Sequence, residues 1–169
     1  VIDVNNALNG EGPFSPERSG TLPVYQVVEL CFSGKFTREQ IMRMVVGEGG
    51  YVGYLGTNNA QEVQRLAETG DPQARLIQDA LGYQVAKLIG EMAVVLSGNV
   101  DAILLTGGLA HNRYLTDYLT ARTTFIAPVH IYPGEDELQA LAMNALRVAR
   151  GETEPRVYTG HPPTTPAHP

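Results

Sequence analysis

The stretch ILLTGGLAHN at residues 103–112 carries the clearest structural pattern in the chain. This stretch overlaps an apolar run at residues 101–106, which is bounded by turn residues. The run predicts a short buried parallel strand. Gly107 and Gly108 end this run, and Asn112 has the residue type that caps a helix, here one that reaches to about residue 121. A strand, a glycine turn and a helix in this order predict an α/β layer architecture.

The glycine turn allows two interpretations. Paired glycines at the carboxyl end of a buried strand let a ring or a phosphate approach the backbone closely, and ligands bind beyond the strand ends in α/β sheets. The Asn112 amide would then face the ligand. Alternatively, the segment is a tight strand–helix turn in which Asn112 only caps the helix. The segment alone favours neither.

The rest of the chain supplies more helices than strands. Strands are expected at residues 1–4 and at residues 125–131, where Pro128 interrupts the run. A long loop is expected at residues 5–23, and the five glycines of residues 47–56 predict a second loop that only superficially resembles a phosphate-binding loop. Helices are expected at residues 22–32, after the capping-box pair Thr37 and Gln40, at 60–68, over some 25 residues from Asp71-Pro72 to Ser97-Gly98, and at 135–150.

Composition excludes several classes of protein. The 169 residues carry a net charge of −6, which argues against a nucleic-acid partner because such proteins need a basic surface. No apolar run approaches the roughly 20 residues that span a bilayer, and no signal peptide opens the chain, so we expect a cytoplasmic protein without membrane contact. The single cysteine, Cys31, rules out a disulfide framework, and we expect it to be buried. The chain begins without Met inside an apolar run, which suggests a fragment of a longer protein.

Three separated segments resemble the acetate and butyrate kinase family, within the superfamily of sugar kinases, heat-shock chaperones and actin. They are DVNNALNGEGPFSPERSGTLP (3–23), LTGGLAHN (105–112) and APVHIYPGEDELQALAMNALRV (127–148), and all look like the butyrate kinase subgroup. The resemblance implies a partial actin-like ATPase (ribonuclease H-like) domain, with a mixed sheet, packed helices and missing amino-terminal strands. It implies a carboxy-terminal nucleotide-binding lobe at residues 1–158. The Pro-, Thr- and His-rich residues 159–169 are expected to form a disordered tail.

The family resemblance also implies an activity. Its members transfer the γ-phosphate of ATP reversibly to a short-chain carboxylate such as butyrate, giving an acyl phosphate and ADP, with Mg²⁺ as the metal. They commonly pair into homodimers or larger homo-oligomers. Because the family's amino-terminal lobe supplies further catalytic residues, this chain is expected to be inactive alone. The alternative is a non-catalytic binding or assembly module derived from the kinase fold.

Arg18 is the expected catalytic residue. It lies in the PERSGT segment of the first loop, where the family has an arginine that contacts the transferring phosphoryl group. Phosphoryl transfer depends on neutralising charge on the equatorial oxygens, and a planar guanidinium does this with several donors. On composition alone, a solvated loop arginine would be the more ordinary interpretation.

The resemblance implies further binding residues, each with an ordinary structural alternative. Thr57, Asn58 and Asn59 occupy the family's adenine side, although they also suit a helix cap. Asp3, Asn5 and Asn6 follow the first expected strand at the phosphate side, where Asn also stabilises turns. The acidic cluster Glu135-Asp136-Glu137 opens the last helix, and carboxylates suit Mg²⁺ as well as the helix dipole. The expected sets are nucleotide-binding Gly107, Gly108, Leu109, Asn112, Thr57, Asn58 and Asn59; phosphate-side Asp3, Asn5 and Asn6; and metal-associated Asp136 and Glu137.

Overall fold

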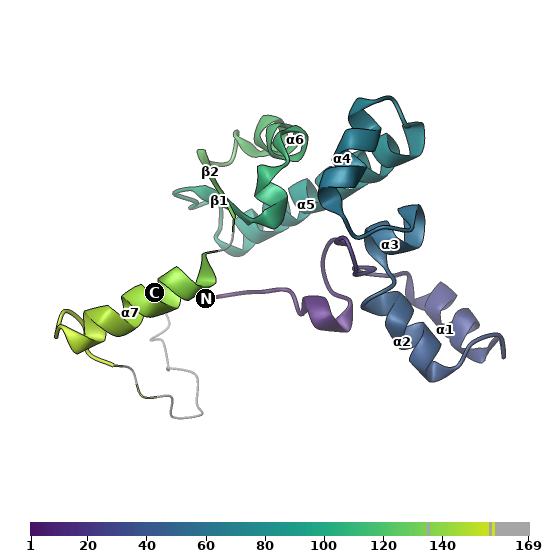
Figure 1. Cartoon of the computed structure of the whole chain (residues 1–169), viewed down its shortest axis with the longest axis horizontal. Coiled ribbons are helices and arrows are strands. Elements are labelled where there is room, and N and C mark those ends of the chain that lie inside the picture. Colours follow the sequence, from purple (N-terminus) through teal and green to yellow (C-terminus); the bar gives the residue numbers. More distant parts are fainter. Residues whose placement is uncertain (135, 156, 158–169) are drawn as a thin grey trace. The chain divides into compact units, whose positions relative to one another are not determined.

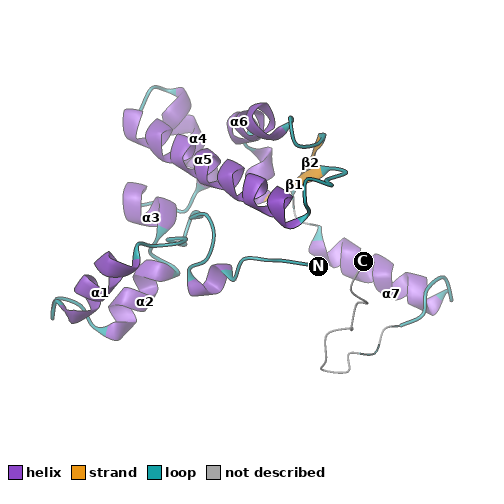
Figure 2. Cartoon of the chain, turned by 180° about the vertical axis from the view of Figure 1, so that it is seen from behind, coloured by secondary structure: helices purple, strands orange, loops and turns teal. Residues whose placement is uncertain are grey.

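The computed structural model describes residues 1–134, 136–155 and 157 of the chain. These residues divide into two compact units, Val1–Gly134 and Glu135–Pro169, which are described separately. The first unit holds helices α1 to α6 and both strands, and the second holds α7 (Figure 1). Helix dominates the described part of the chain, as the colouring in Figure 2 makes plain.

The sheet consists of two parallel strands, β1 (Ile103–Gly107) and β2 (Val129–Pro133). The prediction of a parallel strand at β1 is confirmed, but its complete burial is wrong, because Leu104 is 63% exposed. β2 begins after Pro128 rather than at Phe125. The physical reason is that residues 124–126 form the turn that ends the preceding helix, and Pro128 has no N–H to donate to a ladder.

The prediction of a strand at residues 1–4 is wrong. These residues are extended but unpaired, and Val1, Ile2 and Val4 are all exposed. A strand needs a neighbour to accept its backbone hydrogen bonds, and within the described residues β1 and β2 pair only with each other. High β propensity alone therefore produces no strand here.

The core of the first unit lies where α4 (Ala60–Glu68), α5 (Pro72–Val95) and α6 (Arg113–Thr123) pack together. The long helix begins as its sequence predicts. The Asp71 carboxylate accepts hydrogen bonds from the backbone N–H groups of Gln73 and Ala74, each at 2.9 Å, and Pro72 opens the first turn. The fully or nearly buried apolar side chains include Val63, Ala74, Leu81, Leu115 and Leu119.

Two short helices precede this core. α1 (Val24–Phe32) begins after Pro23, and Cys31 on it is exposed, so the expected burial of this cysteine is wrong. α2 (Arg38–Val45) carries the predicted capping box. The Thr37 hydroxyl accepts from the Gln40 N–H at 3.3 Å, and the Gln40 side chain accepts from the Thr37 N–H at 2.8 Å.

The loop expected at residues 47–56 contains a helix, α3 (Gly50–Leu55), so the prediction from glycine content is wrong. Tertiary packing overrides the low helix propensity of this segment. Tyr51 is 1% exposed, and its ring meets Phe14 edge to face at 6.2 Å between ring centroids. Burial of this large aromatic side chain stabilises the turn that places it.

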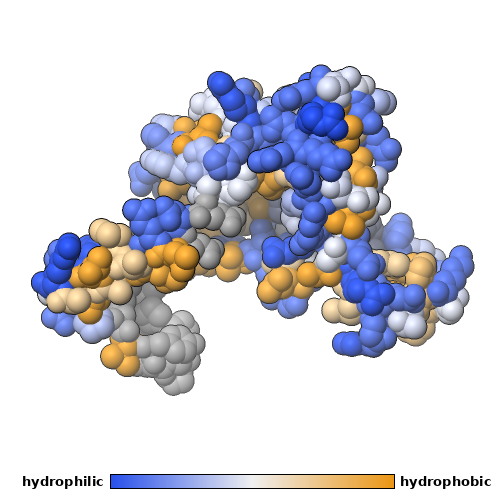
Figure 3. Space-filling view, in the orientation of Figure 1, coloured by the Kyte–Doolittle hydropathy of each residue, from blue (hydrophilic) through white to orange (hydrophobic). Residues whose placement is uncertain are grey.

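The second unit is the amphipathic helix α7 (Glu137–Ala149), which confirms the last expected helix. Its apolar residues include Leu138 and Leu141, which are 83% and 66% exposed, and Figure 3 shows hydrophobic side chains along it. None of the helices in the described ranges is both long and apolar enough to cross a membrane. The tail predicted at residues 159–169 lies outside the described residues.

Candidate functional site

The turn between β1 and α6 forms the first part of the candidate site. Gly107 has φ +87°, a conformation that L side chains rarely adopt, and its N–H and C=O exchange hydrogen bonds with Gly134 at 3.2 and 3.1 Å. The short 3-10 helix Gly108–His111 follows. A Cβ on Gly108 would meet no atom within 4 Å, so the space beside this backbone is open. The turn therefore offers a surface that a flat group can approach.

Asn112 caps α6 with its side-chain oxygen, which leaves its side-chain nitrogen for another contact. Its Oδ1 accepts from the Leu115 N–H at 3.2 Å, as the capping interpretation predicts. The residue is only 4% exposed, and its Nδ2 has no hydrogen-bond partner in the part of the chain that the structure describes. A buried donor left unpaired is costly, so a group that accepts from it would be bound favourably.

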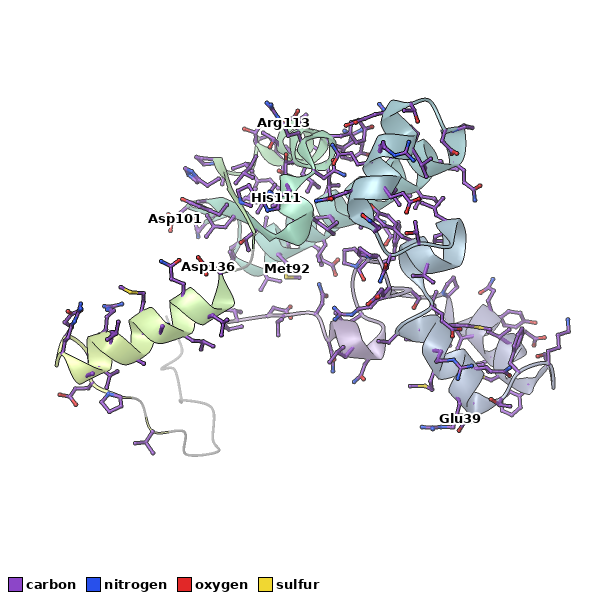
Figure 4. All side chains as sticks on the ribbon, viewed as in Figure 1. Glu39, Met92, Asp101, His111, Arg113 and Asp136 are labelled. Carbon is purple, nitrogen blue, oxygen red and sulfur yellow. The ribbon has the colours of Figure 1, made fainter. Side chains whose placement is uncertain are left out.

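The neighbours of Asn112 complete this part of the site. Leu109 is half-buried and packs against the core, which fixes the 3-10 turn to the domain. His111 is exposed, and Figure 4 labels it beside Arg113 where α6 begins. The His111 Nε2 lies 3.5 Å from the point that a Cβ on Gly134 would occupy.

The loop that carries Arg18 forms the second part of the site. Arg18 makes an antiparallel bridge with Val46, through which the Ser19 N–H donates to the Val45 carbonyl at 3.0 Å. Its own N–H donates to the Ser15 hydroxyl at 3.2 Å. Arg18 is therefore held in a folded loop rather than in a freely solvated one.

The Arg18 side chain is available for an anion. It is half-buried, and among the described residues no carboxylate lies within 4.0 Å of its guanidinium. The nearby Arg43 differs in this respect, because it pairs with Glu48 at 2.9 Å. A guanidinium without an internal counter-ion can bind a phosphate or a carboxylate bidentately.

Of the expected phosphate-side residues, Asn5 contacts Gly12 of this loop. A Cβ on Gly12 would come within 2.9 Å of the Asn5 amide carbon, so the two residues are in contact. The Asp3 carboxylate accepts from the Val4 N–H at 2.7 Å, and the Asn6 N–H donates to Glu11 at 2.6 Å. These bonds are local turn contacts, and a phosphate-binding role for the three residues stays a prediction.

The residues expected beside adenine form the start of α4. The Asn59 side chain accepts from the N–H groups of Gln61 and Glu62 at 3.0 and 3.1 Å, which confirms the helix-cap interpretation for this residue. The Asn58 Nδ2 donates to Glu17 at 2.6 Å, and the Thr57 hydroxyl accepts from the Asn59 N–H. Their contact with a nucleotide stays a prediction.

The acidic cluster at residues 135–137 is the expected metal-associated part of the site. Asp136 is exposed and belongs to the second unit, while the side chain of Glu137 and the whole of Glu135 lie outside the described residues. Across the described ranges, no group of three or more His, Cys, Asp or Glu side chains is placed to hold a metal ion. Mg²⁺ usually takes only one or two protein carboxylates and completes its shell with water and phosphate.

The residues that support the Arg18 loop are not apparent from the sequence. The Phe14 N–H donates to the Gln84 side chain of α5 at 3.1 Å, and Phe14 itself is 4% exposed. A pocket of about 380 Å³ lies beside this contact, lined by Gly12, Pro13, Thr21, Gln84, Lys87, Leu88 and Glu91. In the sequence, this support is indicated only by the aromatic residue Phe14, which lies in a Gly- and Pro-rich loop where burial is not expected.

Comparison with known proteins gives consistent results. A family model described as the Acetokinase family matches residues 11–131. A protein of Clostridium acetobutylicum named Butyrate kinase 2 is 56% identical over 158 residues, which cover 94% of this chain. They cover 44% of that relative, so the chain spans less than half of its length.

Solved structures share the fold. A Porphyromonas gingivalis acetate kinase matches with a TM-score of 0.69 at 19% identity, over 80% of this chain and 41% of that one. A Francisella tularensis propionate kinase matches with a TM-score of 0.62 at 19% identity, over 76% of this chain and 39% of the other. The partial α/β fold expected from the sequence is confirmed by these neighbours.

Proposed function

The chain belongs to the acetokinase family, and from this premise we propose that its protein is a carboxylate kinase. The reaction is a reversible transfer of the ATP γ-phosphate to butyrate or a similar short-chain acid, which forms an acyl phosphate and ADP. The preference for butyrate rests on the 56% identity to a protein named Butyrate kinase 2. In this proposal residues 1–158 are the carboxy-terminal nucleotide-binding lobe.

One observation carries the nucleotide-binding part of the proposal. The Asn112 Nδ2 is a buried, unpartnered donor directly after the open Gly107–Gly108 turn. Bound adenosine has ring nitrogens and ribose oxygens that accept hydrogen bonds. Gly107, Gly108, Leu109 and Asn112 would then form one wall of the pocket, with residues 57–59 on its adenine side.

Arg18 would act on the phosphoryl group. As the γ-phosphate leaves ADP, negative charge is spread over its equatorial oxygens, and a fixed guanidinium stabilises that charge. Arg18 suits this role because its backbone is anchored and its guanidinium forms no ion pair with any described residue. Asp3, Asn5 and Asn6 would lie on the phosphate side.

A magnesium ion would enter with the nucleotide. Asp136 and Glu137 are the residues of this chain that would hold it, and the ion would neutralise charge on the nucleotide phosphates. Assembly into a homo-oligomer, which the family resemblance implies, and a cytoplasmic location are further parts of the proposal.

Arg18→Ala in the full polypeptide tests the proposed reaction. We expect kcat for acyl phosphate formation to fall by at least about 100-fold, which is the scale for losing one transition-state donor. The measurement is a coupled assay with acetate, butyrate and isobutyrate as acceptors. Arg43→Ala is the matched control, because Arg43 is a nearby arginine that is already paired with Glu48. A loss below tenfold for Arg18→Ala would refute its role.

The alternative is a non-catalytic binding or assembly module. It predicts a protein that ignores both nucleotide and carboxylate but associates with itself or with another chain. Titration with ATP distinguishes the two hypotheses, since assembly into a homo-oligomer is expected under both. A stable monomer that does not bind ATP would count against the proposed pocket.

A further inference from the structure

Glu17, which precedes Arg18, is held by a residue far along the chain. The Asn58 Nδ2 donates to the Glu17 Oε1 at 2.6 Å, across 41 positions of sequence. A hydrogen bond to a charged acceptor is shorter and stronger than one between neutral groups. This contact joins the Arg18 loop to the residue just before the cap of α4.

The backbone of Glu17 is anchored as well. Its carbonyl accepts from the N–H groups of Gly47 and Gly49, at 2.8 and 3.2 Å. The glycines let the two segments come this close. A Cβ on Gly49 would lie 2.5 Å from the Ser19 nitrogen, and a Cβ on Gly50 would lie 1.6 Å from the Ser15 carbonyl oxygen. Glu17 is therefore fixed through both its main chain and its side chain.

This anchoring adds to the backbone contacts of Arg18 itself, which are its bridge with Val46 and the hydrogen bond from its N–H to the Ser15 hydroxyl. In the described part of the molecule its guanidinium forms no ion pair, so its position depends on the backbone that carries it. The α4 helix is in turn packed against α5, with Val63 completely buried. The hydrogen bond from Asn58 to Glu17 thus connects the loop that carries Arg18 to the helix α4, which packs on the core of the domain.

We propose that Asn58 is a positioning residue for Arg18, acting through the Glu17 carboxylate. The inference rests on the proposed function of Arg18 and gives Asn58 a role other than contact with adenine. The Asn58 amide orients the loop, and the Arg18 guanidinium acts on the phosphoryl group. Loss of the amide donor frees the loop without removing the arginine.

A reciprocal exchange of side chains tests this role. In Asn58→Asp two carboxylates face each other, so the loop should open more often. In Glu17→Gln/Asn58→Asp the new glutamine amide can donate to the new aspartate, which restores the hydrogen bond with its direction reversed. The first readout is the rate of trypsin cleavage after Arg18, followed by mass spectrometry in the full polypeptide, because cleavage tracks local opening.

We expect Asn58→Asp to speed cleavage after Arg18 by about threefold to tenfold, which is the scale for one net hydrogen bond. The kcat of the kinase reaction should fall by a similar factor while the KM for ATP stays unchanged. The double variant should return both quantities toward the wild-type values. Glu48→Gln is the control, since it alters an exposed ion pair on the neighbouring turn and should change neither.

Two results would overturn the proposal. One is an unchanged cleavage rate in Asn58→Asp. The other is a raised KM for ATP with intact kcat and no restoration in the double variant, which would mean that Asn58 contacts the nucleotide. The effect of Arg18→Ala on kcat tests the proposed function separately. Restored cleavage together with a kcat that is insensitive to Arg18→Ala would support the contact and refute the chemistry given to Arg18.

Discussion

At the scale of single residues, the two parts of the candidate site differ in how they are prepared for a ligand. Among the described residues, the buried Asn112 amide donor has no hydrogen-bond partner and the half-buried Arg18 guanidinium has no ion-pair partner. The Asn112 side chain is oriented by its Oδ1, which accepts from the Leu115 N–H, and the backbone of Arg18 is anchored by its N–H, which donates to the Ser15 hydroxyl. Such groups gain most from a bound anion or acceptor, since the protein has already met the cost of ordering them.

The substitution Gly108→Val tests whether this turn forms a wall of the ATP pocket. Gly108 is not among the glycines with positive φ, and a Cβ at this position would meet no described atom within 4 Å, so we expect the variant to fold. Bound ATP would lose that space, and we expect its Kd to rise by about tenfold or more. Isothermal titration calorimetry measures the effect, and Gly108→Ala should give a smaller one. Equal affinity in all three proteins would exclude this wall from the site.

At the scale of elements, the sequence predicts what local interactions decide. The capping box at Thr37, the Asp71-Pro72 helix start and the β1 strand all appear where their patterns predict them. The errors occur where distant contacts decide. Burial of Tyr51 against Phe14 turns a glycine-rich segment into α3, and the lack of a partner leaves residues 1–4 unpaired.

The candidate site follows the same division. The glycine turn and the Asn112 cap are local, and the sequence analysis identified them. The contacts of Glu17 with Asn58 and of Phe14 with Gln84 span 41 and 70 positions, and no pattern in the sequence announces either pair.

The packing of α5 against α6 gives a prediction with an internal control. A Cβ on Gly82 would lie 2.7 Å from the Tyr118 ring, whereas a Cβ on Gly90 of the same helix would meet nothing within 4 Å. Gly82→Ala should therefore destabilise the fold by about 1–3 kcal/mol through overpacking. Gly90→Ala should stabilise it by up to about 1 kcal/mol through helix propensity. Urea unfolding measures both, and equal shifts of one sign would contradict the close helix contact.

At the scale of the whole molecule, stability depends on keeping Tyr51 neutral. Burial raises the pKa of Tyr51 from its ordinary 10.0 to about 12. Between these values the folded protein keeps a proton that the unfolded chain releases, so the free energy of unfolding falls as the pH rises. The contribution is complete below the unfolded pKa and is lost as the pH passes the folded pKa. It amounts to about 2–3 kcal/mol at most.

Tyr51→Phe isolates this effect from the titration of the other tyrosines. Urea unfolding from about pH 9 to about pH 11 should show a steeper loss of stability in the wild-type protein than in the variant. Parallel curves would show that the Tyr51 hydroxyl is not desolvated.

The cap of α6 has a consequence for how this position can vary. Asparagine combines an acceptor and a donor on one short side chain, and Asn112 uses the acceptor to begin the helix while the donor remains buried and unpaired. Aspartate and serine start helices equally well, yet aspartate has no amide donor and the serine hydroxyl is shorter. Exchange of Asn112 for either residue would keep the helix cap but remove the donor for the ligand. A related protein that no longer binds the ligand could therefore carry aspartate or serine at this position and still form the helix.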